Sequence, residues 1–173
     1  MRDRFRALYE DLHRVSARIL GPTPPPSLLA SDLMHDAFVK LQFEEKKRGA
    51  TGQSSLGAKP DSMFKACFGA ACRDVLADHA RRRRAKKRGG DVGHEEAAST
   101  IGIEGQGVVD AVAMADLLDQ LAAQDPRLAE LVDARVFGGM SVAECAELFG
   151  VSSRTIDRDW QEARSWLSAR LRP

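Results

Sequence analysis

Apolar residues recur at spacings of three and four through most of this 173-residue sequence, and this periodicity constrains the fold more than any other feature. The stretch 4–20 shows the pattern clearly, with apolar residues at Phe5, Leu8, Leu12, Val15 and Ile19. Such spacings place side chains on one face of an α-helix, whereas a half-buried strand alternates every second residue. We find no persuasive strand pattern in the sequence. It therefore predicts an all-α fold.

Proline and glycine divide the first half into three predicted helices. Gly21-Pro22 ends the first helix, and Ser27 or Ser31 is expected to cap the second. Residues 44–60 are rich in Gly, Ser and Lys and are expected to form a mobile loop. Pro60-Asp61-Ser62 then begins a long third helix, which Gly89-Gly90 closes.

The back half is also predicted to be helical. A first helix is expected over 108–123, and Asp125-Pro126 begins the next, with proline at its first position. Gly138-Gly139 ends that helix, and two short helices follow around Gly150. The pattern predicts a second small helical body.

The charge is divided unevenly, although the net charge of the chain is only +1. Residues 1–88 hold 19 Lys and Arg against 10 Asp and Glu, whereas residues 110–173 hold 7 against 11. Residues 89–109 contain four acids and no base. A basic front and an acidic back indicate two modules with different electrostatic roles. We expect domains at 1–88 and 108–173, joined by a flexible acidic linker over 89–107.

The end of the third helix carries the strongest charge run, because seven of the eight residues from Arg81 to Arg88 are basic. By itself the run favours a surface for DNA or RNA, and a solvated helix end and a sorting signal remain alternatives. The acids of the linker offer a further hypothesis, which is that Glu95, Glu96 and Glu104 shield this run in the free protein.

The stretch Ser141–Leu167, "SVAECAELFGVSSRTIDRDWQEARSWL", has the order of a helix-turn-helix. Ser141 with Glu144 predicts a capping box, and Gly150 stands at the turn, where a positive φ is favourable for glycine. Ser152 is then expected to cap the second helix. Alternatively, the pattern fits a plain helical hairpin with no ligand.

The helix-turn-helix hypothesis predicts which side chains point outward. Ile156, Trp160 and Ala163 are expected to point inward, so the opposite face is left to meet the major groove of DNA. The residues expected at that surface are Ser152, Ser153, Arg154, Thr155, Asp157, Arg158 and Gln161. Because the back half is net acidic, this module alone should bind DNA weakly.

Three quoted stretches together resemble the sigma factors of bacterial RNA polymerase. Asp125–Leu167 resembles region 4, "SDLMHDAFVKL" resembles the polymerase-docking helix of region 2, and "MFKACFGAACRDVLADHARRRRAKKRGG" resembles the rest of region 2. The spacing leaves no room for region 3, which is the layout of the extracytoplasmic-function (ECF) group. The DHARRRR and RTIDRDW stretches resemble most closely a subgroup abundant in planctomycetes.

The resemblance implies partners and positions. Region 2 of the family docks on the largest polymerase subunit and captures the minus-10 strand, and region 4 meets the second-largest subunit and the minus-35 duplex. The positions implied for polymerase docking are Asp32, His35, Asp36, Phe38, Val39 and Lys40. Those implied for minus-10 DNA are Arg73, Asp78, His79, Arg81, Arg82, Arg83, Arg84, Lys86, Lys87 and Arg88. The resemblance also implies a possible anti-sigma partner and a monomer on polymerase.

One departure from the family concerns the aromatic residues that help hold separated strands. Both tryptophans, Trp160 and Trp166, fall in the region 4-like part, which leaves Phe43 or Phe64 as substitutes. The main alternative function is a stand-alone helix-turn-helix regulator that binds a duplex operator as a dimer.

Other functional classes find little support in the sequence. It contains no Gly-rich phosphate loop, nucleophile elbow or zinc-protease motif, so no enzymatic activity and no cofactor are expected. The three cysteines lack framework spacing and the four histidines are scattered, so no metal site is expected. No signal peptide or membrane-length apolar run is visible, and a cytoplasmic location is expected.

Overall fold

The computed structural model describes residues 1–21, 28–50, 56–88, 100–103 and 107–171, and it is helical apart from one short pair of strands. The elements in the front half are α1 (Arg2–Ala7), α2 (Tyr9–Leu20), α3 (Ala30–Ala50), η1 (Leu56–Ala58) and α4 (Asp61–Arg88). The later elements are β1 (Thr100–Ile103), β2 (Gly107–Asp110), α5 (Ala111–Gln124), α6 (Pro126–Val132), the π-helix η2 (Asp133–Phe137), α7 (Val142–Phe149) and α8 (Ser153–Leu171).

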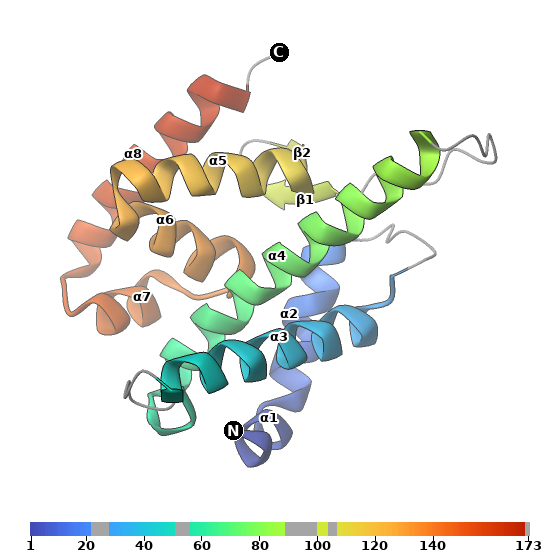
Figure 1. Ribbon diagram of the computed structural model, residues 1–173. Coiled ribbons are helices and arrows are strands. Elements are labelled where there is room, and N and C mark those ends of the chain that lie inside the picture. Colours follow the sequence, from blue (N-terminus) through green and yellow to red (C-terminus); the bar gives the residue numbers. More distant parts are fainter. Residues whose placement is uncertain (22–27, 51–55, 89–99, 104–106, 172–173) are drawn as a thin grey trace.

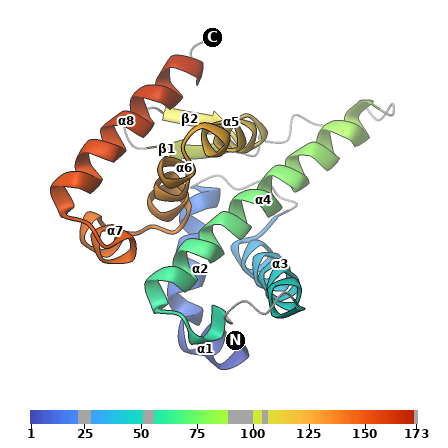
Figure 2. The ribbon, with the colours of Figure 1, turned by 60° about the vertical axis from the view of Figure 1, so that its left-hand side comes forward.

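Helix α4 runs through the middle of the molecule, as Figure 1 shows, with α1 to α3 on one side and α5 to α8 on the other. The view in Figure 2 gives the same arrangement, and in both views the C-terminal end of α4 projects beyond the other elements. The helix therefore presents one side to each half of the chain along its central turns and leaves its basic end at the periphery.

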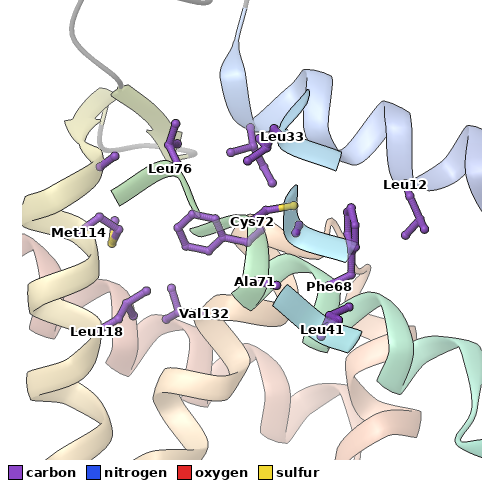
Figure 3. Packing of buried hydrophobic residues seen from close by; sticks show 14 of the residues in the cluster. Leu12, Leu33, Leu41, Phe68, Ala71, Cys72, Leu76, Met114, Leu118 and Val132 are labelled. Carbon is purple, nitrogen blue, oxygen red and sulfur yellow. The ribbon is translucent and has the colours of Figure 1, made fainter. Parts of the chain in front are cut away.

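A single apolar cluster joins the two halves of the chain across α4. Phe68, Cys72 and Leu76 of α4 are fully buried. Figure 3 shows residues of both halves around α4. The labelled neighbours from the front half are Leu12, Leu33 and Leu41, and those from the back half are Met114, Leu118 and Val132. Because burial of apolar area is the main favourable term in folding, this cluster holds the halves together.

The halves approach each other closely at two glycines. A Cβ atom on Gly69 of α4 would lie 2.7 Å from the carbonyl carbon of Phe137 and 2.8 Å from the Cα of Gly138. Both contacts are with backbone, which has little freedom to move away. Only a residue without a side chain fits at Gly69, and the crossing of α4 with η2 depends on it.

Several expected boundaries are confirmed by the structure. Helix α4 begins at Asp61 and extends to Arg88, α2 ends before Gly21, and Pro126 is the first residue of α6. Asp125 caps α6 through its side chain, which accepts a hydrogen bond of 3.1 Å from the backbone N–H of Leu128.

Other boundaries were predicted wrongly. The stretch expected to form one helix over 4–20 is broken at Leu8, where φ is −101° and ψ is 8°. Residues 44–50, expected in a loop, continue α3, and α3 already includes Ser31. Ser31 is therefore not its cap. Instead, the Asp32 carboxylate accepts a 3.1 Å hydrogen bond from the Leu29 N–H at the start of the helix. Ser27, the other expected cap, lies outside the described residues.

The strand pair is the element that the periodicity did not predict. β1 pairs antiparallel with β2, with Thr100 opposite Asp110 and Ile103 opposite Gly107. β2 occupies the start of the stretch expected to be helical from 108, so α5 begins only at Ala111. Asp110 then caps α5, because its carboxylate accepts hydrogen bonds from the backbone N–H groups of Val112 and Ala113.

Candidate nucleic-acid interface

Helices α7 and α8 form the helix-turn-helix that the sequence predicted. The Ser141 hydroxyl accepts a 3.2 Å hydrogen bond from the Glu144 N–H, and the Glu144 carboxylate accepts a 2.8 Å hydrogen bond from the Ser141 N–H. The hydrogen bonds that the Glu144 carboxylate accepts from the backbone N–H and the hydroxyl of Ser141 lower the pKa of Glu144. Gly150 adopts the left-handed conformation, with φ 65° and ψ 35°. The capping box and the glycine turn are therefore confirmed.

The N-terminal part of α8 leaves its predicted recognition face in solvent. The Ser152 hydroxyl caps the helix by accepting a 3.2 Å hydrogen bond from the Thr155 N–H, whereas Ile156 and Ala163 are fully buried on the inner side. The predicted residues that are exposed are Ser152, Ser153, Arg154, Asp157, Arg158 and Gln161, and Thr155 is half-buried. Hydroxyl, guanidinium, carboxylate and amide groups of this kind recognise phosphates and base edges in the major groove.

A buried carboxylate behind this face was not predicted. Asp159 is 5% exposed and accepts a 2.6 Å hydrogen bond from Nη2 of Arg127 on α6. Its other oxygen accepts bonds of 3.3 and 3.1 Å from Nε and Nη2 of Arg158. Asp159 thus holds one edge of the guanidinium group of Arg158, a side chain that is otherwise exposed. Its place three residues after Ile156 and four before Ala163 is the sequence signal that identifies it as an inward position.

The basic end of α4 carries most of the predicted minus-10 residues. Asp78, Arg81, Arg82 and Arg84 are exposed, and His79 and Arg83 are half-buried. Lys86, Lys87 and Arg88 belong to the helix, but their side chains lie outside what the structure describes. This end of the helix projects from the body of the molecule (Figure 1). A projecting helix with clustered guanidinium groups suits a polyanion.

Arg73 differs from the other predicted minus-10 residues because it lies between the halves. Its side chain is 13% exposed, and Nη1 donates hydrogen bonds of 2.9 and 2.8 Å to both carboxylate oxygens of Asp133 on η2. Nη2 also donates a 2.9 Å hydrogen bond to Asp74. Desolvation lowers the pKa of Arg73, but Asp133 and Asp74 outweigh this effect and raise it overall. Arg73 is therefore held by protein carboxylates in this conformation.

Asp133 is a largely covered acid, with its side chain 14% exposed, and it shares the Arg73 guanidinium with Asp74. Burial raises the pKa of Asp133 to about 7 and Arg73 opposes this rise, while the charges of Asp74 and Asp119 add to it. Because the Arg73 guanidinium donates hydrogen bonds to both Asp74 and Asp133, it does not fully compensate the negative charge of Asp133.

Two further α4 arginines contact acids of the back half. Nη2 of Arg81 lies 2.7 Å from the Asp116 carboxylate on α5, and Nη2 of Arg84 lies 2.7 Å from that of Asp110. Both arginines are about half exposed, so each pair is worth little alone. Together with Arg73, they place three predicted DNA-contacting guanidinium groups against acids of this chain.

Helix α3 presents the third predicted surface. Asp32, His35, Asp36 and Val39 are exposed, whereas Lys40 is partly covered and lies 3.0 Å from the carboxylate of Asp74. Phe38 instead packs inward, with its ring stacked on that of Phe5 at a centroid separation of 3.9 Å.

Two apolar residues extend the exposed side of α3 and were not predicted for polymerase docking. Leu29 is 57% exposed and Phe43 is 61% exposed, and they stand seven residues on either side of Asp36. A repeat of seven follows one face of a helix and suits a helical partner. Exposed large apolar residues at that spacing make this face a candidate for contact with a partner.

The described residues hold no group of three or more His, Cys, Asp or Glu side chains placed to bind a metal ion. Burial raises the pKa of the Cys72 thiol to about 12 and that of Cys145 to about 11, so both thiols are protonated near neutral pH. In the part of the chain that the structure covers, no helix is both long and apolar enough to cross a membrane.

Comparison with known proteins gives one match. The family model described as "ECF sigma factor" matches residues 2–173, which includes both halves and the segment between them. Searches of curated proteins and of solved structures gave no match.

Proposed function

The chain belongs to the ECF sigma factor family, and from this premise we propose that it binds core RNA polymerase and directs promoter-specific initiation through minus-10 and minus-35 elements. The observation that carries the proposal is a family match over residues 2–173, on a chain that joins a helix-turn-helix to a basic helix. The division of labour that we propose is polymerase docking and minus-10 recognition by 1–88, a linker over 89–107, and minus-35 recognition by 108–173.

We assign minus-35 recognition to the exposed face of α8. Arg154 and Arg158 lie in the N-terminal half of the second helix of a helix-turn-helix, the part that enters the major groove in such proteins. Asp159 supports this assignment for Arg158, because a carboxylate that accepts two bonds from a guanidinium limits its rotamers. A side chain held in this way loses less entropy when it contacts a base.

We assign minus-10 capture to α4 and the adjacent part of α3. The exposed guanidinium groups of α4 supply phosphate contacts, and separated bases need an aromatic partner for stacking. Phe64 is fully buried, so it is not the partner, whereas Phe43 is exposed on α3. Lys47 Nζ lies 4.9 Å from the centre of the Phe43 ring, which adds a positive charge beside this surface.

We assign docking on the largest polymerase subunit to the exposed face of α3, and contact with the second-largest subunit to the C-terminal half. The α3 face combines acids with apolar residues: Asp32 and Asp36 are exposed beside Leu29 and Val39. Such a mixed face suits a helical partner that offers basic and apolar side chains.

A pull-down with core RNA polymerase followed by run-off transcription tests the function. We expect the purified chain to bind core polymerase and to give a transcript from a promoter of its own genome. Asp36→Arg reverses an exposed charge, so it should weaken polymerase binding at least about tenfold without unfolding the chain. Asp3→Asn on α1 is the control and should leave binding unchanged.

The outcomes separate the two candidate functions. A chain that ignores core polymerase but binds a duplex operator unaided as a dimer would be a stand-alone regulator. A chain that forms a polymerase complex and a specific transcript acts as a sigma factor. The finer proposals are a monomeric state on polymerase, action in the cytoplasm, possible control by an anti-sigma protein, and membership of the planctomycete-type subgroup.

A further inference from the structure

Asp159 is a buried acid that lies between two arginines in contact with solvent. The residue is 5% exposed, whereas the side chain of Arg127 on α6 is 45% exposed and that of Arg158 on α8 is 74% exposed. A buried carboxylate is costly unless it is paired and hydrogen-bonded. Both partners of this one face solvent on the side of the molecule where α8 begins, so the pairing also determines how the two arginines are presented.

Each carboxylate oxygen of Asp159 serves a different arginine. Oδ2 accepts a 2.6 Å hydrogen bond from Nη2 of Arg127. Oδ1 accepts hydrogen bonds of 3.3 and 3.1 Å from Nε and Nη2 of Arg158. The contact with Arg127 holds the carboxylate from a second helix. Asp159 therefore gives Arg158 a fixed partner, whose position is set by the packing of α6 against α8.

These contacts leave a defined part of Arg158 available. A guanidinium group carries its N–H donors at Nε, Nη1 and Nη2, all in one rigid plane. The edge formed by Nε and Nη2 is directed at Asp159. The donors that remain are those of Nη1 and the outer N–H of Nη2, at the end of the side chain. They form a second fork, with the parallel N–H bonds that a bidentate contact requires.

A fork of parallel donors held in one plane suits a guanine base. In the major groove guanine presents N7 and O6 as neighbouring acceptors, whereas adenine presents an acceptor beside a donor. A phosphate also offers acceptor oxygens, but its contact depends mainly on charge. Asp159 offsets part of the positive charge of Arg158 and leaves the outer fork intact. The pairing thus weakens the attraction to a phosphate and preserves the geometry that reads a base.

We propose that Asp159 is a positioning residue for sequence recognition: held by Arg127, it orients Arg158 so that the outer donors of Arg158 read a guanine in duplex DNA. The proposal deepens the proposed function, and it rests on that function only in taking duplex DNA to be the ligand of α8. Asp159 and Arg127 act through Arg158, and neither needs to touch the base.

An ion pair that only joins α6 to α8 predicts a different result. Its loss would lower the stability of the chain and reduce the binding of every duplex alike. A positioning role instead predicts a loss of preference at one base pair, and only while Arg158 is present. Sequence preference is therefore the readout that distinguishes the two roles.

The main test uses the full chain and a pool of duplexes randomised over about eight base pairs, roughly the reach of a recognition helix and its flanks. Unrelated duplex is added as competitor to remove sequence-independent binding, and the bound fraction is sequenced. We expect the wild type to enrich guanine at one position at least about fivefold, and Asp159→Asn to enrich it less than about twofold. Binding to a single unrelated duplex at low salt should not fall, because the variant gains one positive charge.

Glu162→Gln is the matched control, since it removes an exposed acid of the same helix with the same change in charge. It should retain the enrichment of guanine. Arg158→Ala should lose the enrichment at the same position as Asp159→Asn. The double variant Arg158→Ala/Asp159→Asn should lose no more than Arg158→Ala alone, because residues that act as one unit are not additive.

Arg127→Ala covers the case in which Asp159→Asn does not fold, which circular dichroism detects. This change removes a half-exposed side chain and releases Asp159 from α6. We expect it to keep the fold and to lower the enrichment of guanine at the same position at least about twofold, a smaller effect than the loss of a whole bidentate contact.

The proposal is overturned if the wild type enriches no guanine, or if the folded variants of Asp159 and Arg127 retain the full enrichment. It is also overturned if Asp159→Asn lowers the preference equally at every position, or if its effect adds to that of Arg158→Ala. The test contains no polymerase. A chain that failed to bind polymerase but showed these preferences would contradict the proposed function and leave this inference standing.

Discussion

The two arginine-bearing surfaces of this chain differ in what already contacts them. On α8, Arg154 and Arg158 are exposed, and the acid that touches Arg158 lies behind it and supports it from the same helix. On α4, Arg73, Arg81 and Arg84 meet acids from the other half of the chain. Arginines therefore pair with an acid of their own helix at one site and with acids of the other half of the chain at the other site.

The difference shows that the composition of a surface does not determine whether its side chains are available to bind nucleic acid. The α4 end has the higher density of positive charge, and sequence alone favours it as the stronger nucleic-acid site. Because α4 lies between the halves, acids of the other half partly neutralise its charge, whereas the acid that pairs with Arg158 belongs to α8 itself. Each of the following predictions tests one side of this contrast.

The largest expected effect concerns the shared core. Phe68→Ala should lower the free energy of unfolding by about 3–5 kcal/mol, since a fully buried ring is lost. Phe68 lies in the front half, whereas both tryptophans lie on α8. If α4 holds both halves in one cooperative unit, the tryptophan fluorescence transition in urea should shift together with the circular dichroism transition.

Phe43→Ala is the control for this experiment, because it removes the same ring from an exposed position of α3. It should change stability by no more than about 0.5 kcal/mol. A tryptophan transition that ignored Phe68→Ala would mean that the two halves unfold independently, and the shared core would then contribute little.

The next effect separates the two arginine surfaces directly. Arg73→Ala should cost about 3 kcal/mol of stability, because it leaves the buried Asp133 carboxylate without its main partner. Arg154→Ala removes an exposed side chain and should cost no more than about 0.5 kcal/mol. Urea unfolding of both variants measures the difference, and similar costs would show that Arg73 is not a buried partner.

For binding to promoter DNA we expect the opposite order, with a larger effect from Arg154→Ala than from Arg73→Ala. Arg154→Ala should weaken binding of the polymerase complex to its promoter by about 1–3 kcal/mol, with a changed preference at one minus-35 base pair. Binding to a panel of single-base promoter variants measures this. A uniform loss across the panel would instead identify Arg154 as a phosphate contact.

The smallest effect is a dependence on pH. The pKa of Asp133 is raised to about 7 in the folded chain, above its ordinary value of 3.8, so the folded state binds the extra proton. Stability from this group is therefore greatest at low pH and is lost as pH rises through about 7. Between pH 6 and pH 8 the loss should be about 1 kcal/mol. Asp133→Asn should flatten the profile, and an unchanged slope would assign it to other groups.

Local features were predictable at positions where the residue type favours a single backbone conformation or a single capping role. Ser141 with Glu144, Gly150, Ser152 and Pro126 each marked a helix boundary that the structure confirms. The outward face of α8 was also predictable from the sequence, because a period of 3.6 residues separates inner from outer positions once Ile156 and Ala163 are taken as buried.

Features that depend on distant parts of the chain were not predictable. The pairing of Arg73 with Asp133 joins residues 60 positions apart, and nothing local to either residue indicates it. The strand pair escaped detection because β1 and β2 are only four residues each, too short for a pattern of alternation to stand out. Helix α3 continues through 44–50, where a loop was predicted from composition.

The most direct test of the account compares the distance between the halves in the free chain and in the polymerase complex. Dyes on cysteines placed at the exposed Ala7 of α1 and Ala169 of α8, with Cys67 replaced by serine, allow this by single-molecule energy transfer. We predict a single distance for the free chain and a longer distance once core polymerase is bound. An open free chain, or a distance that polymerase leaves unchanged, would contradict the account.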